Sequence, residues 1–142
     1  MHLTCIILHV EDDDNDSFFF QRALRALSFV GTYRRVGTVP DAIRYFSAEG
    51  EFSDRKSFPT PDVLVMDSTL DAGKSVAELF AWLKPRPEYE KLVKVALTGT
   101  ANPAIHDWLR SEGVATTLSK GARPSDFRGA VEAILREVAA KL

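Results

Sequence analysis

Short apolar runs alternate with amphipathic stretches along the whole chain, and this alternation limits the fold more than any other feature of the sequence. The runs lie at residues 5–10, 33–36, 63–67, 93–97 and 116–118. Strands that alternate with helices indicate βαβ units, which build a mostly parallel sheet covered by helices on both faces. The first and third runs are apolar on both strand faces, so we expect them at the centre of the sheet.

Apolar residues at helical spacing predict a helix after each run. The clearest spans residues 125–141, with an inner stripe of Phe127, Val131, Ile134 and Val138. We expect Asp16 or Ser17 to cap the first helix. Its predicted inner stripe is Phe20, Ala23, Leu24 and Leu27. Of the other three helices, the second is expected to begin at Pro40, the third to span residues 75–84 and the fourth to begin at Pro103. Ile105, Trp108 and Leu109 are expected on one side of the fourth helix.

The composition is that of one ordinary globular domain spanning residues 1–142. The chain is 45% hydrophobic and 27% charged. No apolar run approaches the about 20 residues that cross a membrane, so we expect no membrane association. The single Cys5 lies in an apolar run and is interpreted as a core residue of a cytoplasmic protein. With 18 Lys and Arg against 20 Asp and Glu, the net charge of -2 argues against nucleic-acid binding.

Polar residues follow the apolar runs at the points where the predicted strands end. The first run leads into Glu11, Asp12, Asp13, Asp14 and Asp16. The third ends in Asp67, Thr98 follows the fourth, and Lys120 comes shortly after the fifth. Ligands of open parallel sheets bind beyond the carboxyl ends of the strands, so we expect these groups to share one crevice.

Carboxylates gathered in a crevice repel one another, and a bound cation relieves that repulsion. Oxygen ligands favour Mg²⁺, which is often shared with a phosphate group. A lysine and a threonine complement phosphoryl oxygens, and a central aspartate can act as a nucleophile that forms an acyl phosphate. The pattern therefore predicts phosphoryl transfer onto Asp67.

At these positions the sequence resembles the receiver domains of two-component response regulators. The similar segments are VEDDDND at 10–16, VLVMDSTL at 63–70, VALTGT at 95–100 and LSKG at 118–121. The acidic run and the long connection before the third strand are most similar to stand-alone receivers that partner bacterial phytochrome kinases.

The resemblance implies an α/β, flavodoxin-like (βα)5 fold, a doubly wound parallel sheet with strand order 2-1-3-4-5. It implies that Asp67 accepts a phosphoryl group from a histidine kinase or phosphotransfer protein. Asp12 and Asp67 would ligate Mg²⁺ directly, Glu11 would hold one of its waters, and Thr69 would offer its backbone carbonyl. Thr98 and Lys120 would contact the phosphoryl oxygens.

The sequence departs from the receiver pattern mainly at the switch positions. Thr117 replaces a residue that is commonly aromatic, which argues against an aromatic rotamer switch. Gly121 replaces a common proline after the lysine, so the usual cis peptide bond is not expected there. Asp71 also replaces a common proline, and Gly99 is expected to loosen the loop that follows Thr98.

Two other motifs imitate known sites. The segment STLDAGKS at 68–75 resembles a nucleotide phosphate loop, but Ser68 stands where its first glycine belongs, so a small nucleotide hydrolase is the lesser alternative. Asp12, Asp14 and Asp16 have the spacing of a calcium loop, but Ser17 and Ala23 replace its glycine and its glutamate. We interpret Asp13, Asp14 and Asp16 as a solvated loop and helix cap.

Three side chains outside the crevice carry further predictions. His9, inside the first strand, is interpreted as a hydrogen-bonded core residue. Phe18 lies nearly opposite the buried stripe of its helix, so it is a candidate docking contact for a kinase. Trp108 either anchors a partner or packs in the core.

The sequence thus predicts a single-domain response regulator, a signalling phosphoacceptor that is not an enzyme acting on an external metabolite. Only 22 residues follow Lys120, enough for one helix and no effector domain. Output is expected through protein contacts with a downstream target, with a homodimer as one option. The main alternative is a receiver-like adaptor that works without phosphorylation, which Thr117 and Gly121 favour.

Overall fold

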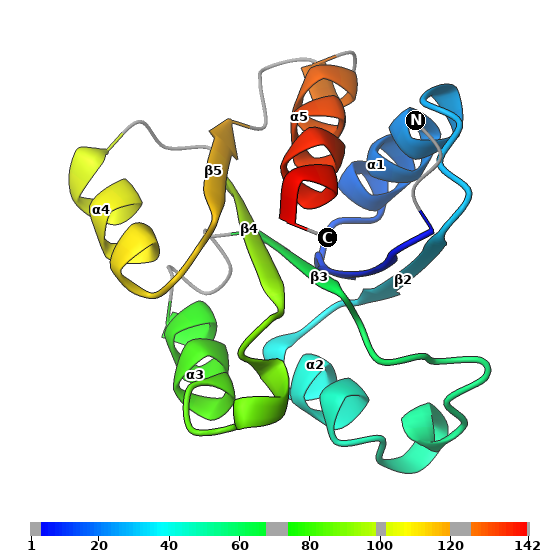
Figure 1. Ribbon diagram of the computed structural model, residues 1–142, viewed down its shortest axis with the longest axis vertical. Helices are drawn as coiled ribbons and strands as arrows, with labels where there is room; N and C mark the ends of the chain where they lie inside the picture. The colour runs from blue at the N-terminus through cyan, green and yellow to red at the C-terminus, as the bar shows by residue number, and fades with distance from the viewer. Residues whose placement is uncertain (1–3, 68–73, 99–101, 120–125, 142) are drawn as a thin grey trace.

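The computed structural model describes residues 4–67, 74–98, 102–119 and 126–141, and its strands form one parallel sheet (Figure 1). The strands are β1 (Ile6–Val10), β2 (Thr32–Val36), β3 (Val63–Asp67), β4 (Val93–Thr98) and β5 (Thr116–Ser119). Their order is β2-β1-β3-β4-β5. The predicted flavodoxin-like order is therefore confirmed, as is the central position of β3 with β1 beside it.

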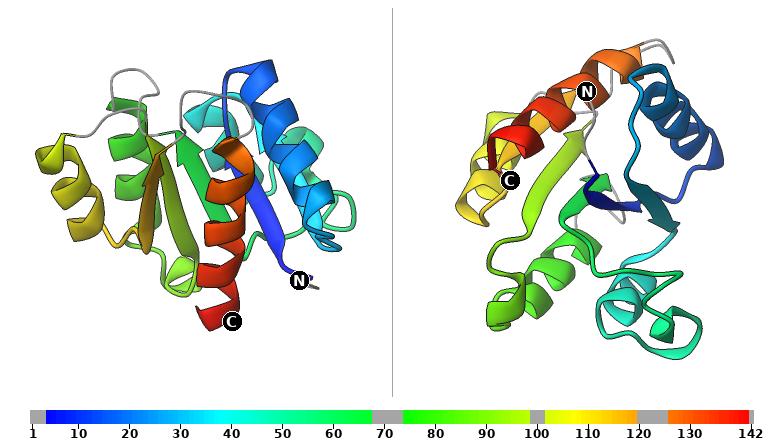
Figure 2. Two further views of the ribbon diagram at one scale, coloured as in Figure 1. Left: turned by 90° about the horizontal axis from the view of Figure 1, so that it is seen from above. Right: turned by 45° about the vertical axis from the view of Figure 1, so that its right-hand side comes forward.

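Helices cover both faces of the sheet (Figure 2). They are α1 (Asp14–Ala26), α2 (Val39–Phe46), α3 (Lys74–Leu83), α4 (Pro103–Ser111) and α5 (Asp126–Lys141). Two short 3-10 helices, η1 (Gly50–Ser53) and η3 (Pro87–Tyr89), lie in the connections. Within the described residues, none of the helices has the length and apolarity needed to cross a bilayer.

Two apolar clusters form the core, one on each face of the sheet. One lies under α1 and α5 and contains the predicted stripe of the last helix, Phe127, Val131, Ile134 and Val138. The other lies under α2, α3 and α4. Successive strand residues point to opposite faces, so Ile7 belongs to the first cluster and Leu8 to the second. Cys5 is buried in the first cluster as predicted, and burial raises the pKa of its thiol to about 11.

The start of α1 differs from the prediction. Asp13 is the N-cap and its side chain accepts a hydrogen bond from the Asp16 backbone N–H at 2.9 Å, so the predicted cap at Asp16 or Ser17 is wrong. The helix begins earlier because Asp13 already satisfies an unpaired N–H of the first turn, where further acidic side chains are favourable. Beyond this start, Phe20, Ala23 and Leu24 are buried as predicted, whereas Leu27 is the C-cap.

The predicted inner side of α4 is confirmed only in part. The helix opens at Pro103, and the Asn102 side chain accepts a hydrogen bond from the Ala104 backbone N–H. Leu109 is fully buried, but Ile105 is exposed. Residues four positions apart differ by about 40° around the helix axis, so Ile105 lies at the edge of the buried face of this short helix.

Arginine side chains hold the long connection between α2 and β3, and Arg34 of β2 donates to the Ser57 backbone carbonyl at 2.8 Å. The Arg55 guanidinium donates hydrogen bonds to the backbone carbonyls of Tyr45, Phe46 and Phe58. Phe52 of η1 is buried against Tyr45. A stretch that is polar in sequence is therefore fixed in place by backbone hydrogen bonds and a small aromatic group.

We expect Gly31→Ala to destabilise the protein. A Cβ at Gly31 would lie 2.2 Å from the backbone oxygen of Cys5, which accepts the hydrogen bond that starts the β1–β2 pairing. Overpacking of this kind lowers the free energy of unfolding by about 1–3 kcal/mol. Gly129→Ala is the matched control, because open space surrounds this α5 position and alanine favours a helix over glycine by about 1 kcal/mol. In urea denaturation, the free energy of unfolding should fall for Gly31→Ala and rise for Gly129→Ala. Equal changes in the two variants would contradict the predicted clash at Gly31.

Candidate functional site

The register of the sheet brings the predicted site residues to one edge. Val10 of β1 lies opposite Met66 of β3, so the next residues along the two strands, Glu11 and Asp67, stand level with each other. Asp67 in turn pairs with Leu97 of β4, which puts Thr98 one step further out. The carboxyl ends of β1, β3 and β4 therefore meet where the sequence predicted a crevice.

Three carboxylates converge at this edge. Among the described residues, Glu11, Asp12 and Asp67 each offer an oxygen, and these oxygens all lie within 4.8 Å of one another. Glu11 is 1% exposed and Asp67 is 5% exposed, whereas Asp12 faces solvent. Buried carboxylates at this spacing repel one another strongly, and a divalent cation relieves the repulsion. The donors are all hard oxygens, which fits such a cation.

The loop after β1 is fixed from two directions. The Asp13 backbone N–H donates a hydrogen bond to Glu11 Oε1 at 3.1 Å. From β2, Arg35 Nε donates to the Glu11 backbone carbonyl at 2.8 Å, and its Nη1 atom lies 2.7 Å from Asp14 Oδ1. The interpretation of these acids as a helix cap is confirmed for Asp13, but Asp14 and Asp16 lie in the first turn of α1 and not in a solvated loop. The Arg35 guanidinium adds positive charge beside the acidic cluster.

Of the two residues predicted to contact the phosphoryl group, Thr98 lies within the described residues and Lys120 does not. Thr98 is the last residue of β4 and is 1% exposed at the same edge as Asp67. Thr69 and Lys120 lie outside the described residues, as do Gly99, Asp71 and Gly121. Lys120 directly follows Ser119, which pairs with Thr98 across β4 and β5.

Thr117, at the position expected to act in switching, joins β5 to α4. Its Oγ1 atom is 2.9 Å from Nδ1 of His106 in α4, a hydrogen bond between the two elements. The sequence had assigned His106 no role. A short hydroxyl in place of an aromatic ring therefore makes a polar contact with the helix beside it.

The two candidate docking residues have different surroundings. Phe18 is 52% exposed and packs edge-on against Phe19, which in turn contacts Phe127 of α5. Trp108 is half-buried and lies against Phe80 of α3 at 5.7 Å between ring centroids. Core packing accounts for the contacts of Trp108, while Phe18 presents an exposed apolar side chain on α1.

His9 is fully buried, as predicted, but its partners were not anticipated. Its Nδ1 atom is 2.8 Å from the Tyr33 hydroxyl of β2, which is 3.0 Å from Ser17 Oγ of α1. Its Nε2 atom is 3.8 Å from Glu11 Oε2. A lone polar side chain within an apolar strand was the signal that a polar partner must exist on a neighbouring element.

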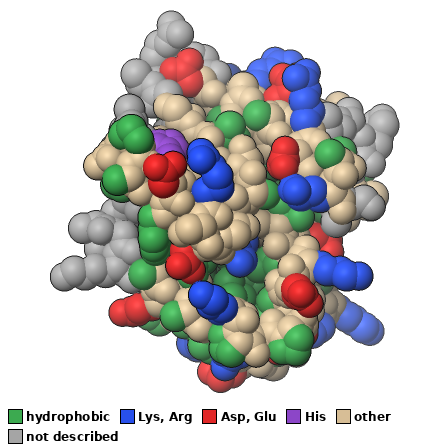
Figure 3. Space-filling view, turned by 60° about the vertical axis from the view of Figure 1, so that its left-hand side comes forward, with side chains coloured by type: hydrophobic (Ala, Val, Ile, Leu, Met, Phe, Trp, Pro, Cys, Tyr) green, Lys and Arg blue, Asp and Glu red, His purple; other side chains and the backbone are tan. Residues whose placement is uncertain are grey.

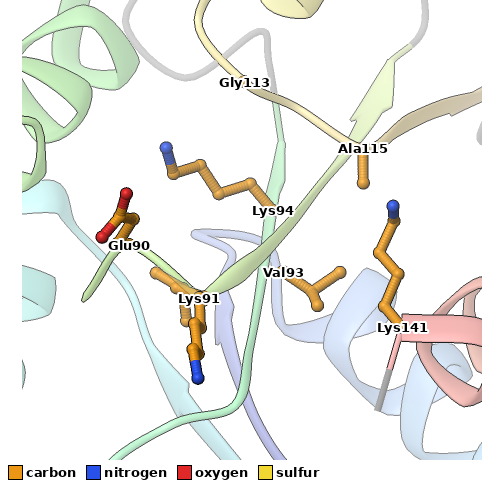
Figure 4. A pocket seen from close by; sticks show the side chains of 8 residues that line it. Glu90, Lys91, Val93, Lys94, Gly113, Ala115 and Lys141 are labelled. Atoms are coloured by element: carbon orange, nitrogen blue, oxygen red, sulfur yellow. The ribbon is translucent and has the colours of Figure 1, made fainter. Parts of the chain in front are cut away.

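Lysines line a hollow at the opposite, amino-terminal edge of the sheet, but they do not form a binding site. Lys91, Lys94 and Lys141 direct their ammonium groups apart (Figure 4). Lys94 Nζ donates to the Glu112 backbone carbonyl, and burial lowers the pKa of its ammonium group. On the α4 side of the molecule, acidic and basic side chains are interspersed (Figure 3). Neither surface resembles a converging anion site.

Comparison with known proteins identifies the fold. No protein-family model matches the sequence, and no curated protein sequence matches it. Among solved structures, the response regulator RPA3017 of red light signalling in R. palustris is 21% identical, with a TM-score of 0.83 over 94% of this chain and 92% of that one. The phosphorylated cyanobacterial phytochrome response regulator RcpA is 23% identical, with a TM-score of 0.83 over 99% and 97%. The Mn²⁺-bound response regulator Rcp1 is 24% identical, with a TM-score of 0.77 over 92% and 91%.

These similarities show that the chain has the receiver-domain fold. The neighbours are response regulators, one of them a phytochrome response regulator, so the predicted resemblance is confirmed at the level of the fold. The acidic cluster of Glu11, Asp12 and Asp67 is consistent with the binding of a divalent metal in such a fold.

A divalent cation should stabilise the protein through these carboxylates. At about ten times its dissociation constant, a ligand that binds only the folded state adds about 1.4 kcal/mol to the free energy of unfolding. We expect Mg²⁺ to raise the melting temperature of the wild type. Asp14→Asn is the control and should respond in the same way, because the Asp14 carboxylate pairs with Arg35 and is not part of the acidic cluster. Asp12→Asn should lose the response, as measured by thermal denaturation with and without EDTA. An undiminished response in Asp12→Asn would contradict the assignment.

Proposed function

We propose that the chain is a single-domain response regulator that accepts a phosphoryl group on Asp67. The observation that carries the proposal is the position of Asp67, buried at the end of the central strand with its oxygens close to those of Glu11 and Asp12. The receiver fold supports a signalling protein rather than an enzyme acting on a metabolite. The resemblance of the four strand-end segments supports the same role.

In the proposed reaction an oxygen of Asp67 attacks the phosphorus atom of a phosphohistidine. The new O–P bond forms as the P–N bond breaks, and the released imidazole takes up a proton. The buried Asp67 side chain is held at the end of β3, so little freedom is lost in placing it for in-line attack. Thr98 and Lys120 contact the phosphoryl oxygens and stabilise their charge.

Mg²⁺ is the proposed cofactor. Asp12 and Asp67 would hold it directly, Glu11 would hold one of its waters, and Thr69 would contribute its backbone carbonyl. The cation, when bound, neutralises charge on the phosphoryl oxygens. The Mn²⁺-bound state named for Rcp1 and the phosphorylated state named for RcpA support this assignment.

Output is proposed to pass through protein contacts. The phosphoryl donor is a histidine kinase or phosphotransfer protein, and the response goes to a downstream protein target or to a second copy of the chain. The hydrogen bond between Thr117 and His106 connects β5 with α4, the next helix along the chain after β4. The single buried Cys5 fits the reducing cytoplasm, which is the proposed location.

An adaptor that works without phosphorylation is the second candidate. The observation that favours it is the polar contact of Thr117, which stands where receivers commonly carry the aromatic side chain of their switch. Both candidates share the fold, so chemistry at Asp67 separates them.

The decisive experiment is intact mass spectrometry after incubation with phosphoramidate and Mg²⁺. We expect the wild type to gain the mass of one phosphoryl group, because Asp67 is the carboxylate that offers the nucleophile. EDTA and the Asp67→Asn substitution should each abolish the gain. No gain in the wild type under any of these conditions would contradict the phosphoacceptor and favour the adaptor.

Phe18→Ala should slow phosphotransfer from a phosphorylated histidine kinase while leaving phosphorylation by phosphoramidate unchanged. Truncating an exposed aromatic contact costs about 1–2 kcal/mol of binding, or roughly a tenfold loss in rate at subsaturating kinase. Val30→Ala is the matched control, because Val30 is also exposed and apolar, at 58%. Radiolabelled phosphotransfer from a panel of kinases provides the measurement. Equal losses with both donors would show that Phe18 has no docking role.

A further inference from the structure

A chain of polar groups runs from the exposed Gln21 of α1 through the half-buried Tyr33 of β2 to the buried His9 of β1 and the acidic cluster. Gln21 Nε2 lies 3.4 Å from Ser17 Oγ, and Ser17 Oγ lies 3.0 Å from the Tyr33 hydroxyl. The Tyr33 hydroxyl is 2.8 Å from His9 Nδ1, and His9 Nε2 is 3.8 Å from Glu11 Oε2. Ser17 is 2% exposed, while His9 and Glu11 are at most 1% exposed, so the chain is shielded from bulk water at its inner end.

The donors and acceptors of this chain can all point in one direction. Burial raises the pKa of Tyr33 to about 12, so its hydroxyl keeps a proton to donate at neutral pH. If Tyr33 donates to His9 Nδ1, the neutral imidazole carries its own proton on Nε2, the atom that faces Glu11. Ser17 then donates to the Tyr33 oxygen and itself accepts from the Gln21 amide. Each donor as far as His9 Nδ1 thus meets an acceptor, and His9 Nε2 faces Glu11 Oε2 at 3.8 Å, a distance longer than a hydrogen bond.

The imidazole of His9 is also held by packing. Its ring lies 4.4 Å from the Phe20 ring of α1 and 5.8 Å from the Tyr33 ring, measured between centroids. His9 and Glu11 are two residues apart along the strand direction, so their side chains lie on the same face of the sheet. A fixed ring on that face limits where the Glu11 carboxylate can turn.

We propose that His9 and Tyr33 are positioning residues that hold the Glu11 carboxylate in the orientation required by the divalent cation site. The proposal rests on the proposed function, because it concerns the affinity of that same site. Outer groups that orient metal-binding side chains change metal affinity by about 10–100-fold when they are removed. Tyr33 acts through His9, and neither side chain is proposed to contact the cation or the phosphoryl group.

The test measures Mn²⁺ binding at pH 7.5 from the electron paramagnetic resonance signal of the free ion. Tyr33→Phe removes only the hydroxyl and should raise the Mn²⁺ dissociation constant by about 10-fold. Tyr45→Phe is the matched control, because it removes another buried tyrosine hydroxyl, which donates to the Pro59 carbonyl on the opposite side of the sheet. Its dissociation constant should equal that of the wild type, although both variants lose a buried hydrogen bond.

Phosphorylation by phosphoramidate supplies a second readout. For Tyr33→Phe, the Mg²⁺ concentration at half-maximal rate should rise by about the same factor while the rate at saturating Mg²⁺ is unchanged. Ser17→Ala interrupts the same chain from α1 and should move the Mn²⁺ dissociation constant in the same direction, so the test does not depend on one variant folding.

The outcomes separate the two proposals. A Mn²⁺ dissociation constant for Tyr33→Phe and Ser17→Ala within twofold of the wild type would overturn the positioning role and leave the proposed function standing. A similar weakening in Tyr45→Phe would also overturn it, because general loss of stability would then explain the effect. Failure of the wild type itself to bind Mn²⁺ would overturn the proposed function together with this inference.

Discussion

Repulsion between buried carboxylates at the carboxyl edge of the sheet is the constraint around which the rest of the molecule is arranged. It follows from register: the pairing of Val10 with Met66 leaves Glu11 and Asp67 level with each other at the ends of β1 and β3. A parallel sheet covered on both faces gives these charges little water. The surrounding groups reduce this repulsion. The Arg35 guanidinium places positive charge at the loop, and the Asp13 N–H donates a hydrogen bond to Glu11. The oxygens of Glu11, Asp12 and Asp67 lie within 4.8 Å of one another, a spacing that suits a divalent cation site.

The core on the α1 side meets this constraint with a polar network. His9 occupies a position whose neighbours along the strand, Ile7 and Cys5, are apolar and buried in the same cluster. A polar side chain there is unfavourable unless it is hydrogen-bonded, and Tyr33 supplies that bond. Leucine at this position would remove the need for Tyr33 and Ser17 as partners, but it would also remove the ring beside Glu11. The polar network thus replaces simple apolar packing at this position and orients the Glu11 carboxylate.

Features with a short sequence period were predictable, whereas the exact position of the α1 cap and the contacts between distant residues were not. The alternation of runs predicted a parallel sheet covered by helices, and the receiver resemblance implied its strand order. The ends of the predicted strands pointed to Glu11, Asp12, Asp67 and Thr98 as site residues. The α1 cap was placed too late because Asp13 was read as part of a uniform acidic run, and only the bond from the Asp16 N–H distinguishes it. Tyr33 was missed because it pairs with a residue 24 positions away, and the sequence of β2 alone is a weak strand pattern.

The contact between Thr117 and His106 sets a limit on how α4 and β5 can be coupled. An aromatic side chain at position 117 could adopt two orientations, one buried and one exposed, that differ widely in buried apolar area. Threonine has a small side chain with three χ1 rotamers, so its buried area changes little. What changes when Thr117 rotates is one hydrogen bond to His106, worth about 0.5–1.5 kcal/mol. Coupling free energies of about 1–3 kcal/mol are typical of allosteric proteins, so this bond alone reaches only the lower end of that range. A larger response through α4 therefore requires its apolar contacts to change as well, among them the packing of Trp108 against Phe80.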